Sequence, residues 1–215
     1  MIISLTGFMG CGKSSVGRRL SELLCCPFMD LDDVIVESTG RSIPEIFETD
    51  GEAAFRKMEQ EALMGILSAS EPRQCAPLAP SHFAGPSPYA GVRKCQFRTN
   101  ALTPSKTPDC HPERREGSVD LVMALGGGTV MTPECAEIVH SQTRCIYLRA
   151  TVDTLVSHLE NEAAGRPMLA DSSLRERITT LMAQRSATYE KTAHVIIDTD
   201  GKSIEAIASE IISLI

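Results

Sequence analysis

The sequence contains no apolar run that could cross a membrane. None of its hydrophobic stretches approaches the roughly 18 residues that a spanning helix needs. The short apolar segment at residues 2–5 leads into a glycine-rich stretch and not into a small-residue cleavage site, so it does not have the form of a secretory signal. These absences predict a cytoplasmic protein without a membrane partner.

The chain also has fewer basic than acidic residues. The chain has 21 Lys and Arg against 28 Asp and Glu, a formal net charge of −7. This balance argues against a general binder of nucleic acid or of anionic membranes. With 215 residues, 42% of them hydrophobic, the chain is long enough for one domain with a full core, which we expect to be a monomer.

No C-x-x-C pair occurs, although the chain has eight cysteines. Without that spacing a structural zinc site is not expected. The lack of a signal peptide predicts reduced thiols and not a disulfide framework. Cys11 has two interpretations: Lys13 and a helix N-terminus could lower its thiol pKa, or it is a small filler residue.

Glycines, a lysine and two serines follow the first apolar segment. They form Gly7-x-x-x-x-Gly12-Lys13-Ser14, the phosphate-binding loop pattern. Backbone N–H groups would surround a polyphosphate, Lys13 would add a mobile charge, and the Ser14 hydroxyl would reach Mg²⁺. The alternative is a glycine-rich turn that matches by chance. The apolar segment before it and the helical spacing after it favour the phosphate loop.

Five near-continuous apolar segments predict strands, which suit a parallel sheet covered on both faces. They are residues 2–5, 27–31, 121–125, 144–148 and 194–197. Amphipathic helices alternate with them, two of which are expected to begin with the Ser42 and Glu45 capping box and with Thr132-Pro133. This alternation predicts a three-layer α/β domain with right-handed crossovers.

Residues 71–118 break the alternation. They contain eight of the 12 prolines and three cysteines, with neither a helical nor a strand period. We expect a disordered loop that interrupts a single domain spanning residues 1–215. The alternative is a basic regulatory or partner-binding segment in mid-chain.

Carboxylates gather where the second predicted strand ends, in "DLDD" at residues 30–33. The carboxyl end of a parallel strand beside a phosphate loop suits a metal and an acceptor hydroxyl. On an extended backbone Asp30 and Asp32 would point the same way, so that one holds Mg²⁺ through water and the other orients the nucleophile. Alternatively the cluster caps a helix, with Asp33 as the N-cap.

Three consecutive glycines, Gly126 to Gly128, end the third predicted strand. They would let a ligand approach closely and expose N–H groups to an oxygen-rich small molecule, whereas a plain turn needs fewer. Arg56 lies on the polar side of its helix and, taken alone, would be a solvated surface charge. The parallel strand order 2-3-1-4-5 would bring the residues after strands 1, 2 and 3 to one rim.

Taken together, these motifs resemble the shikimate kinase family, which has the three-layer P-loop kinase fold of nucleoside-monophosphate kinases plus a lid. The resemblance runs through the phosphate loop, "DLD", "TGRSIPEIFETDGEAAFR", "LGGG", "GRPML" and "RSATYEKTAHVIIDT". It implies ATP-dependent phosphorylation of the 3-hydroxyl of shikimate, in aromatic amino-acid biosynthesis, with ATP as co-substrate and Mg²⁺ as metal.

The resemblance also implies roles for single residues. The residues expected to bind the nucleotide are Gly10, Cys11, Gly12, Lys13, Ser14, Ser15 and Arg166. Shikimate binding falls to Asp32, Arg56, Gly126, Gly127, Gly128 and Arg185, and metal binding to Ser14 and Asp30. The catalytic residues are Lys13, Asp32 as the candidate base, and Arg166 in a lid at about 161–172. The supporting shell is Phe47, Phe55 and Glu59.

The chemistry of the residues fits this interpretation. A small ring with one carboxylate and three hydroxyls needs arginine forks at one end and acceptors at the other. Two features depart from the family. His158 stands near the place of an adenine-stacking arginine, and residues 71–118 replace a short turn.

Two other functions remain open. Another small-molecule kinase of this fold, such as gluconate kinase, would share the phosphate loop and the lid arginine, but the full acceptor set favours a carboxylated ring. A catalytically silent nucleotide-binding protein, in which the insert recruits a partner, would not need the catalytic positions that are all intact here.

Overall fold

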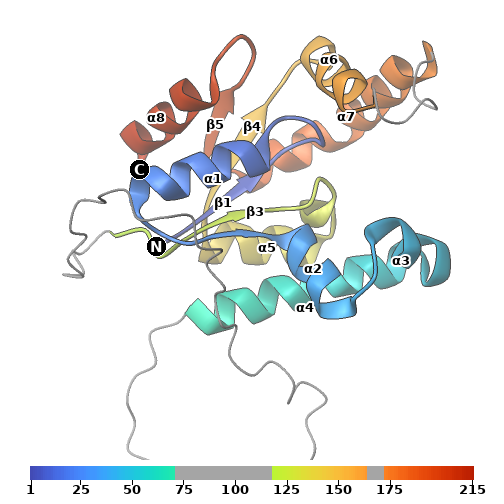
Figure 1. Ribbon diagram of the computed structural model, residues 1–215, viewed down its shortest axis with the longest axis horizontal. Helices are drawn as coiled ribbons and strands as arrows, with labels where there is room; N and C mark the ends of the chain where they lie inside the picture. Colours follow the sequence, from blue (N-terminus) through green and yellow to red (C-terminus); the bar gives the residue numbers. More distant parts are fainter. Residues whose placement is uncertain (71–117, 164–171) are drawn as a thin grey trace, which may run out of the picture. The chain divides into compact units, whose positions relative to one another are not determined.

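One parallel sheet of five strands, in the order β2-β3-β1-β4-β5, organises the protein (Figure 1). The computed structural model describes residues 1–70, 118–163 and 172–215. The strands are β1 (Ile2–Thr6), β2 (Phe28–Asp30), β3 (Leu121–Ala124), β4 (Arg144–Arg149) and β5 (Val195–Asp198). All four strand pairs are parallel. The predicted strand order and direction are therefore confirmed.

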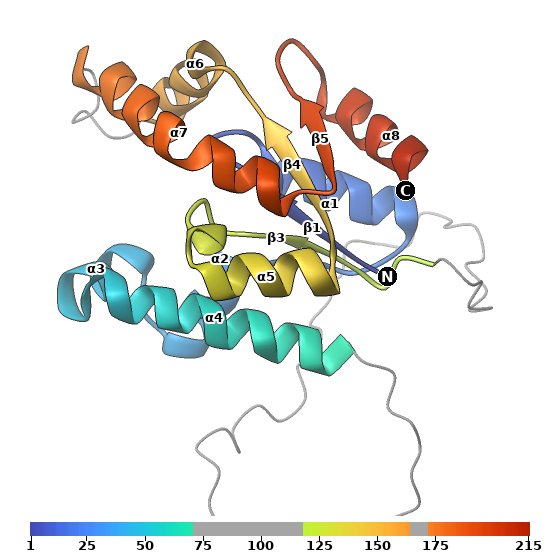
Figure 2. The same cartoon turned by 180° about the vertical axis from the view of Figure 1, so that it is seen from behind.

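Helices connect the strands and cover the sheet. They are α1 (Lys13–Leu24), α2 (Leu31–Thr39), α3 (Ile43–Thr49), α4 (Gly51–Ser70), α5 (Pro133–Gln142), α6 (Val152–Ala163), α7 (Ser172–Thr192) and α8 (Ile204–Leu214), with a 3-10 turn η1 (Thr129–Met131). Helices α1 and α8 lie over one face in Figure 1, and α4 and α5 lie over the other in Figure 2. The predicted three-layer arrangement is confirmed.

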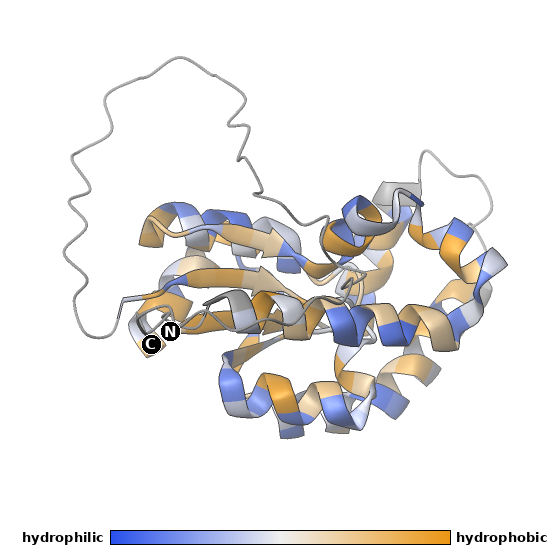
Figure 3. Cartoon of the chain, turned by 90° about the horizontal axis from the view of Figure 1, so that it is seen from below, coloured by the Kyte–Doolittle hydropathy of each residue, from blue (hydrophilic) through white to orange (hydrophobic). Residues whose placement is uncertain are grey.

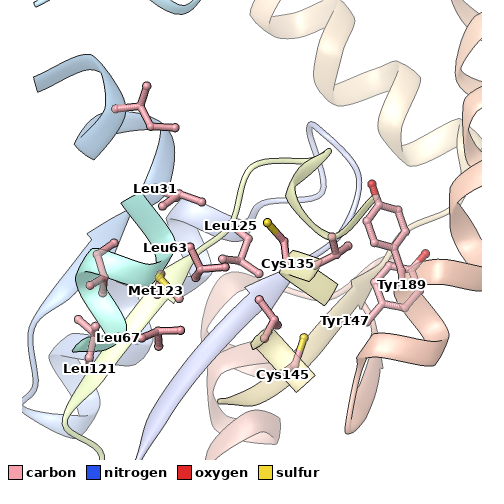
Figure 4. Packing of buried hydrophobic residues seen from close by; sticks show 14 of the residues in the cluster. Leu31, Leu63, Leu67, Leu121, Met123, Leu125, Cys135, Cys145, Tyr147 and Tyr189 are labelled. Atoms are coloured by element: carbon pink, nitrogen blue, oxygen red, sulfur yellow. The ribbon is translucent and has the colours of Figure 1, made fainter. Parts of the chain in front are cut away.

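Successive side chains of a strand point to opposite faces of the sheet, so the hydrophobic core is divided into two clusters, one on each face. Leu121 and Met123 of β3 face a cluster with α4 and α5, while Val122 between them faces a cluster with α1 and α8. The first cluster, shown in Figure 4, ends at two stacked rings, Tyr147 of β4 and Tyr189 of α7. Hydrophobic colour follows the strands through the middle of Figure 3. Both faces of the sheet are thus buried, as the apolar runs predicted.

Capping residues mark where two of the predicted helices begin. The Glu45 carboxylate accepts the N–H of Ser42 at 2.7 Å, which is one bond of the predicted capping box, and it also accepts the Ser42 hydroxyl at 2.7 Å. Helix α5 begins at Pro133 with Thr132 as its N-cap. Both predicted starts are confirmed.

The carboxylate cluster after β2 differs from the prediction in its backbone. Strand β2 ends at Asp30 and α2 begins at Leu31, so Asp30 and Asp32 do not share one extended segment. The N-cap is Asp30 and not Asp33, because the Asp30 carboxylate accepts the Asp32 N–H at 3.1 Å. The prediction failed because an aspartate at a strand end caps the next helix more readily than it extends the strand.

Two predicted segments fall mostly outside the described residues. Only Ser118 of the expected insert at 71–118 is described, and the central part of the lid at 161–172, with Arg166, is not. Helix α6 reaches Ala163 and helix α7 starts at Ser172 on either side of it. Within the described ranges, no helix combines the length and apolar character needed to span a membrane.

Helix α1 approaches the sheet so closely that its Gly17 leaves no room for a side chain. A Cβ atom there would lie 2.4 Å from the Phe28 ring and 3.3 Å from Leu5 Cδ1. We expect Gly17→Ala to lower the free energy of unfolding by about 1 to 3 kcal/mol, the usual cost of overpacking. Urea denaturation measures this change.

Gly65 in α4 is the matched control, because a Cβ atom there would meet nothing within 4 Å. Gly65→Ala should raise the free energy of unfolding by up to about 1 kcal/mol through helix propensity alone. Equal effects of the two substitutions would contradict the close α1–sheet contact.

Candidate active site

The phosphate loop connects β1 to α1 through glycines with left-handed backbone angles. Gly7, Gly10 and Gly12 have φ values of 144°, 79° and 88°. A Cβ atom on Gly7 would lie only 2.6 Å from the Leu148 carbonyl oxygen, so glycine is required there for space as well as for φ. The Lys13 ammonium donates to the carbonyl of Gly7 at 2.9 Å and to that of Phe8 at 3.0 Å.

A cavity of about 570 Å³ opens in front of this loop. It is lined by Gly10, Cys11, Gly12, Lys13, Ser14, Ser15, Val16, His158, Thr199, Lys202, Ser203, Ile204 and Ile207. All the loop residues predicted to bind nucleotide are among them. The backbone N–H groups and the two lysines that line the cavity suit a polyphosphate, and the size of the cavity suits a small ligand.

The far wall of the cavity was only partly predicted. His158 lines it, and its Nδ1 donates to the Gly10 carbonyl at 2.8 Å. Thr199, Lys202 and Ser203 come from the turn between β5 and α8, which the sequence analysis did not single out. Their signal was the polar, glycine-containing turn "TDGKS" directly after a strand.

Ser14 and Asp30 meet beside the phosphate loop. The Ser14 hydroxyl donates to Asp30 Oδ2 at 2.6 Å, while Asp30 Oδ1 caps α2. A hydroxyl and a carboxylate are ligands that Mg²⁺ accepts. Among the described residues no group of three or more His, Cys, Asp or Glu could hold a metal, so a cation here would also need oxygens from a bound phosphate or from water.

Asp32 is the electrostatically unusual residue of the site. Its Oδ1 atom is buried and has no hydrogen-bond partner within the described part of the chain. Burial, reinforced by the charges of Asp30 and Glu59 and opposed by Lys13, raises the pKa of Asp32 to about 6. A buried acceptor without a donor is rare in folded proteins, and it is suited to a ligand hydroxyl.

The glycines after β3 form a wall that acidic and basic side chains approach closely. A Cβ atom on Gly126 would lie 2.6 Å from Glu59 Oε1 and 2.8 Å from Asp32 Oδ1. A Cβ atom on Gly128 would lie 2.4 Å from Arg56 Nη1. The wall therefore needs glycine for the close approach of these side chains, and the carboxylates and Arg56 gather around it.

Arg56 is held in place by Glu59. The Glu59 side chain is 1% exposed and accepts from Arg56 Nη1 at 2.6 Å and from the Thr129 hydroxyl at 2.6 Å. The Arg56 guanidinium also lies 5.7 Å from the centre of the Phe55 ring, which in turn packs 4.8 Å from Phe47. Arg56 is thus a fixed, half-buried cation and not the solvated charge that its helix position alone indicated.

Helix α7 supplies the other basic group. Arg185 Nη1 lies 3.5 Å from the Gly127 carbonyl oxygen, and the Tyr189 hydroxyl donates to the same oxygen. Sequence reasoning named Arg185 but missed Tyr189 and Thr129. The available signals were the spacing of four residues between Arg185 and Tyr189, which places both on one helix face, and the threonine directly after the three glycines.

Comparisons with known proteins agree on one family. The family model described as shikimate kinase matches residues 9–72 and 114–215. The chain is 32% identical over 210 residues to a shikimate kinase of Thermus thermophilus, covering 98% of this chain and 87% of that protein. It is 34% identical over 209 residues to one of Geobacter metallireducens, covering 97% and 88%.

A solved structure gives the same result. The shikimate kinase of Acinetobacter baumannii in complex with shikimate matches with a TM-score of 0.70 and 27% identity, covering 99% of this chain and 91% of that one.

Burial of the Asp32 charge should reduce stability at neutral pH. Because the folded state raises the pKa of Asp32 to about 6, its carboxyl binds a proton more tightly folded than unfolded. Its contribution to stability is therefore present below its ordinary pKa and is lost as the pH rises through about 6. We expect Asp32→Asn to raise the free energy of unfolding by about 1 to 3 kcal/mol at about pH 8 and to change it little at about pH 4.

Urea denaturation at both pH values measures this difference. Asp33→Asn, on the same helical turn but with a side chain that is 69% exposed, should shift stability by less than about 1 kcal/mol at either pH. A gain for Asp32→Asn that does not depend on pH would contradict the raised pKa.

Proposed function

The chain belongs to the shikimate kinase family, and we propose that it uses this site to transfer the terminal phosphoryl group of ATP to the 3-hydroxyl of shikimate. It is an ATP-dependent kinase with a phosphate loop. The observation that best supports the proposed acceptor is the buried, unpartnered oxygen of Asp32 beside the glycine wall. A hydroxyl donor is what this oxygen lacks.

The acceptor binds between the arginines and Asp32. Arg56 and Arg185 approach the glycine wall from α4 and α7, and two guanidinium groups suit a carboxylate through charge-assisted hydrogen bonds. With its carboxylate there, shikimate directs a ring hydroxyl to Asp32. The Asp32 carboxylate accepts the hydroxyl proton as the 3-oxygen forms its bond to phosphorus and the bond between phosphorus and the ADP oxygen breaks.

The phosphate loop holds the other substrate. Lys13, which donates to two loop carbonyls in this structure, turns to the phosphates when nucleotide binds. The Ser14 hydroxyl would hold Mg²⁺ directly and Asp30 through water. When bound, the metal neutralises charge on the phosphates, and the chain itself supplies alignment.

Arg166 completes the proposed catalytic set. The resemblance to the family gives it the role of a lid arginine that meets the transferring phosphoryl group and helps to exclude water. The sequence around it, "AAGRPMLADSS", is small and polar, which suits a closing segment. Arg166 lies outside the described residues, so this role rests on the sequence.

We also propose that residues 71–118 are an insertion in a single domain. The family model leaves residues 73–113 unmatched while matching both flanks, which supports this proposal. A cytoplasmic location and a monomeric state remain predictions from the sequence.

A coupled assay of ADP release tests the function. The wild-type protein should release ADP only when shikimate is present and should not accept gluconate in its place. Asp32→Asn should lower kcat by roughly 10² to 10⁴, the usual range for loss of a general base. Calorimetry should show unchanged ATP binding, because Asp32 does not line the nucleotide cavity.

The control is again Asp33→Asn, which should keep kcat close to that of the wild type. Full shikimate-dependent turnover by Asp32→Asn would show that another group orients the acceptor hydroxyl. If the wild-type protein released ADP equally fast with and without shikimate, the proposed function itself would be contradicted.

A further inference from the structure

The Gly127 carbonyl oxygen has two donors on one helix. Tyr189 donates its hydroxyl, and Arg185 approaches with Nη1 at 3.5 Å. Because 3.5 Å is at the outer limit for a hydrogen bond, the bond from Arg185 to this oxygen is weak, and the Arg185 guanidinium also interacts with the Tyr189 hydroxyl. Tyr189 therefore supplies the main hydrogen bond to this oxygen.

Tyr189 is a rigid donor. It is 0% exposed, and its ring stacks on Tyr147 with centroids 5.1 Å apart (Figure 4). Burial raises the pKa of Tyr189 to about 12, so its hydroxyl keeps its proton over the working pH range of a kinase. The Tyr189 hydroxyl is thus a donor to Gly127 throughout the neutral pH range.

Gly127 also contacts the phosphate loop. A Cβ atom there would lie 3.4 Å from the Met9 N atom and 3.7 Å from the Gly7 carbonyl oxygen, which are ordinary van der Waals distances. Gly127 thus lies against the phosphate loop while its carbonyl oxygen accepts from α7.

On the basis of the proposed function, we infer that Tyr189 is a positioning residue: it occupies the Gly127 carbonyl and so leaves Arg185 free to bind the acceptor carboxylate. Without the hydroxyl, a half-buried carbonyl oxygen would lack its donor, and the nearest alternative is the Arg185 guanidinium. A charged donor forms a stronger hydrogen bond than a neutral one. Shikimate would then have to break that bond in order to bind.

Tyr189→Phe tests this inference, because it removes the hydroxyl and keeps the stacked ring. The KM for shikimate should rise roughly two- to tenfold, which corresponds to the net value of one hydrogen bond, while kcat and the KM for ATP change less than about twofold. A KM does not depend on the concentration of folded enzyme, so partial loss of folded protein does not hide the result.

Tyr147→Phe is the matched control. It removes the hydroxyl of the other ring in the stack, which makes no contact with Gly127 among the described hydrogen bonds, and it should leave the KM for shikimate unchanged. An equal rise in both variants would overturn the inference, because it would reflect disturbed ring packing.

A double-mutant cycle tests the route through Arg185. In the Arg185→Ala background the competing donor is absent, so adding Tyr189→Phe should not raise the KM for shikimate further. A rise by the same factor in both backgrounds would overturn the competition.

The same assay separates the two proposals. A wild-type protein without shikimate-dependent ADP release would overturn the proposed function. A wild-type protein with that activity, beside Tyr189→Phe with an unchanged KM, would overturn only the role of Tyr189.

Discussion

Crowded negative charge around Gly126 is the constraint on which the site depends. Glu59 and Asp32 both approach this residue so closely that a Cβ atom there would displace their carboxylates. Glu59 is compensated by Arg56 and the Thr129 hydroxyl, and Asp30 by the Ser14 hydroxyl. Buried charges are tolerated when they are paired, and two of these contacts also fix side chains that the proposed reaction uses, Arg56 and Ser14.

Asp32 is the exception, because one of its oxygens has no donor among the residues that the structure describes. Such a group reduces stability in the free protein, and a ligand hydroxyl would remove that cost. The hydroxyl of the proposed substrate would thus supply the hydrogen bond that the Asp32 oxygen lacks. The Asp32 carboxylate therefore lowers stability at the position where the reaction needs a base with a raised pKa.

The sheet order brings these groups together. Strand β1 lies between β3 and β4, and β2 lies next to β3, so the phosphate loop, the start of α2 and the glycine wall share one rim. The strands could be predicted because near-continuous apolar runs are a signal in the local sequence. Their order could be predicted because it brings the motifs after strands 1, 2 and 3 to one rim. The N-cap role of Asp30 was missed because strand end and helix start coincide there. Thr129, Tyr189 and Lys202 were missed because their contacts join segments that are far apart in the sequence.

The pH dependence of kcat/KM for shikimate at limiting ATP is the sharpest test that Asp32 accepts the hydroxyl proton, because it reports the ionisation of the free enzyme's essential groups. We expect kcat/KM to fall about tenfold per pH unit below about pH 6, as the Asp32 carboxylate takes up a proton. A profile that stays flat through that range, or that falls only near the ordinary pKa of an aspartate, would contradict the role of Asp32 as the buried acceptor.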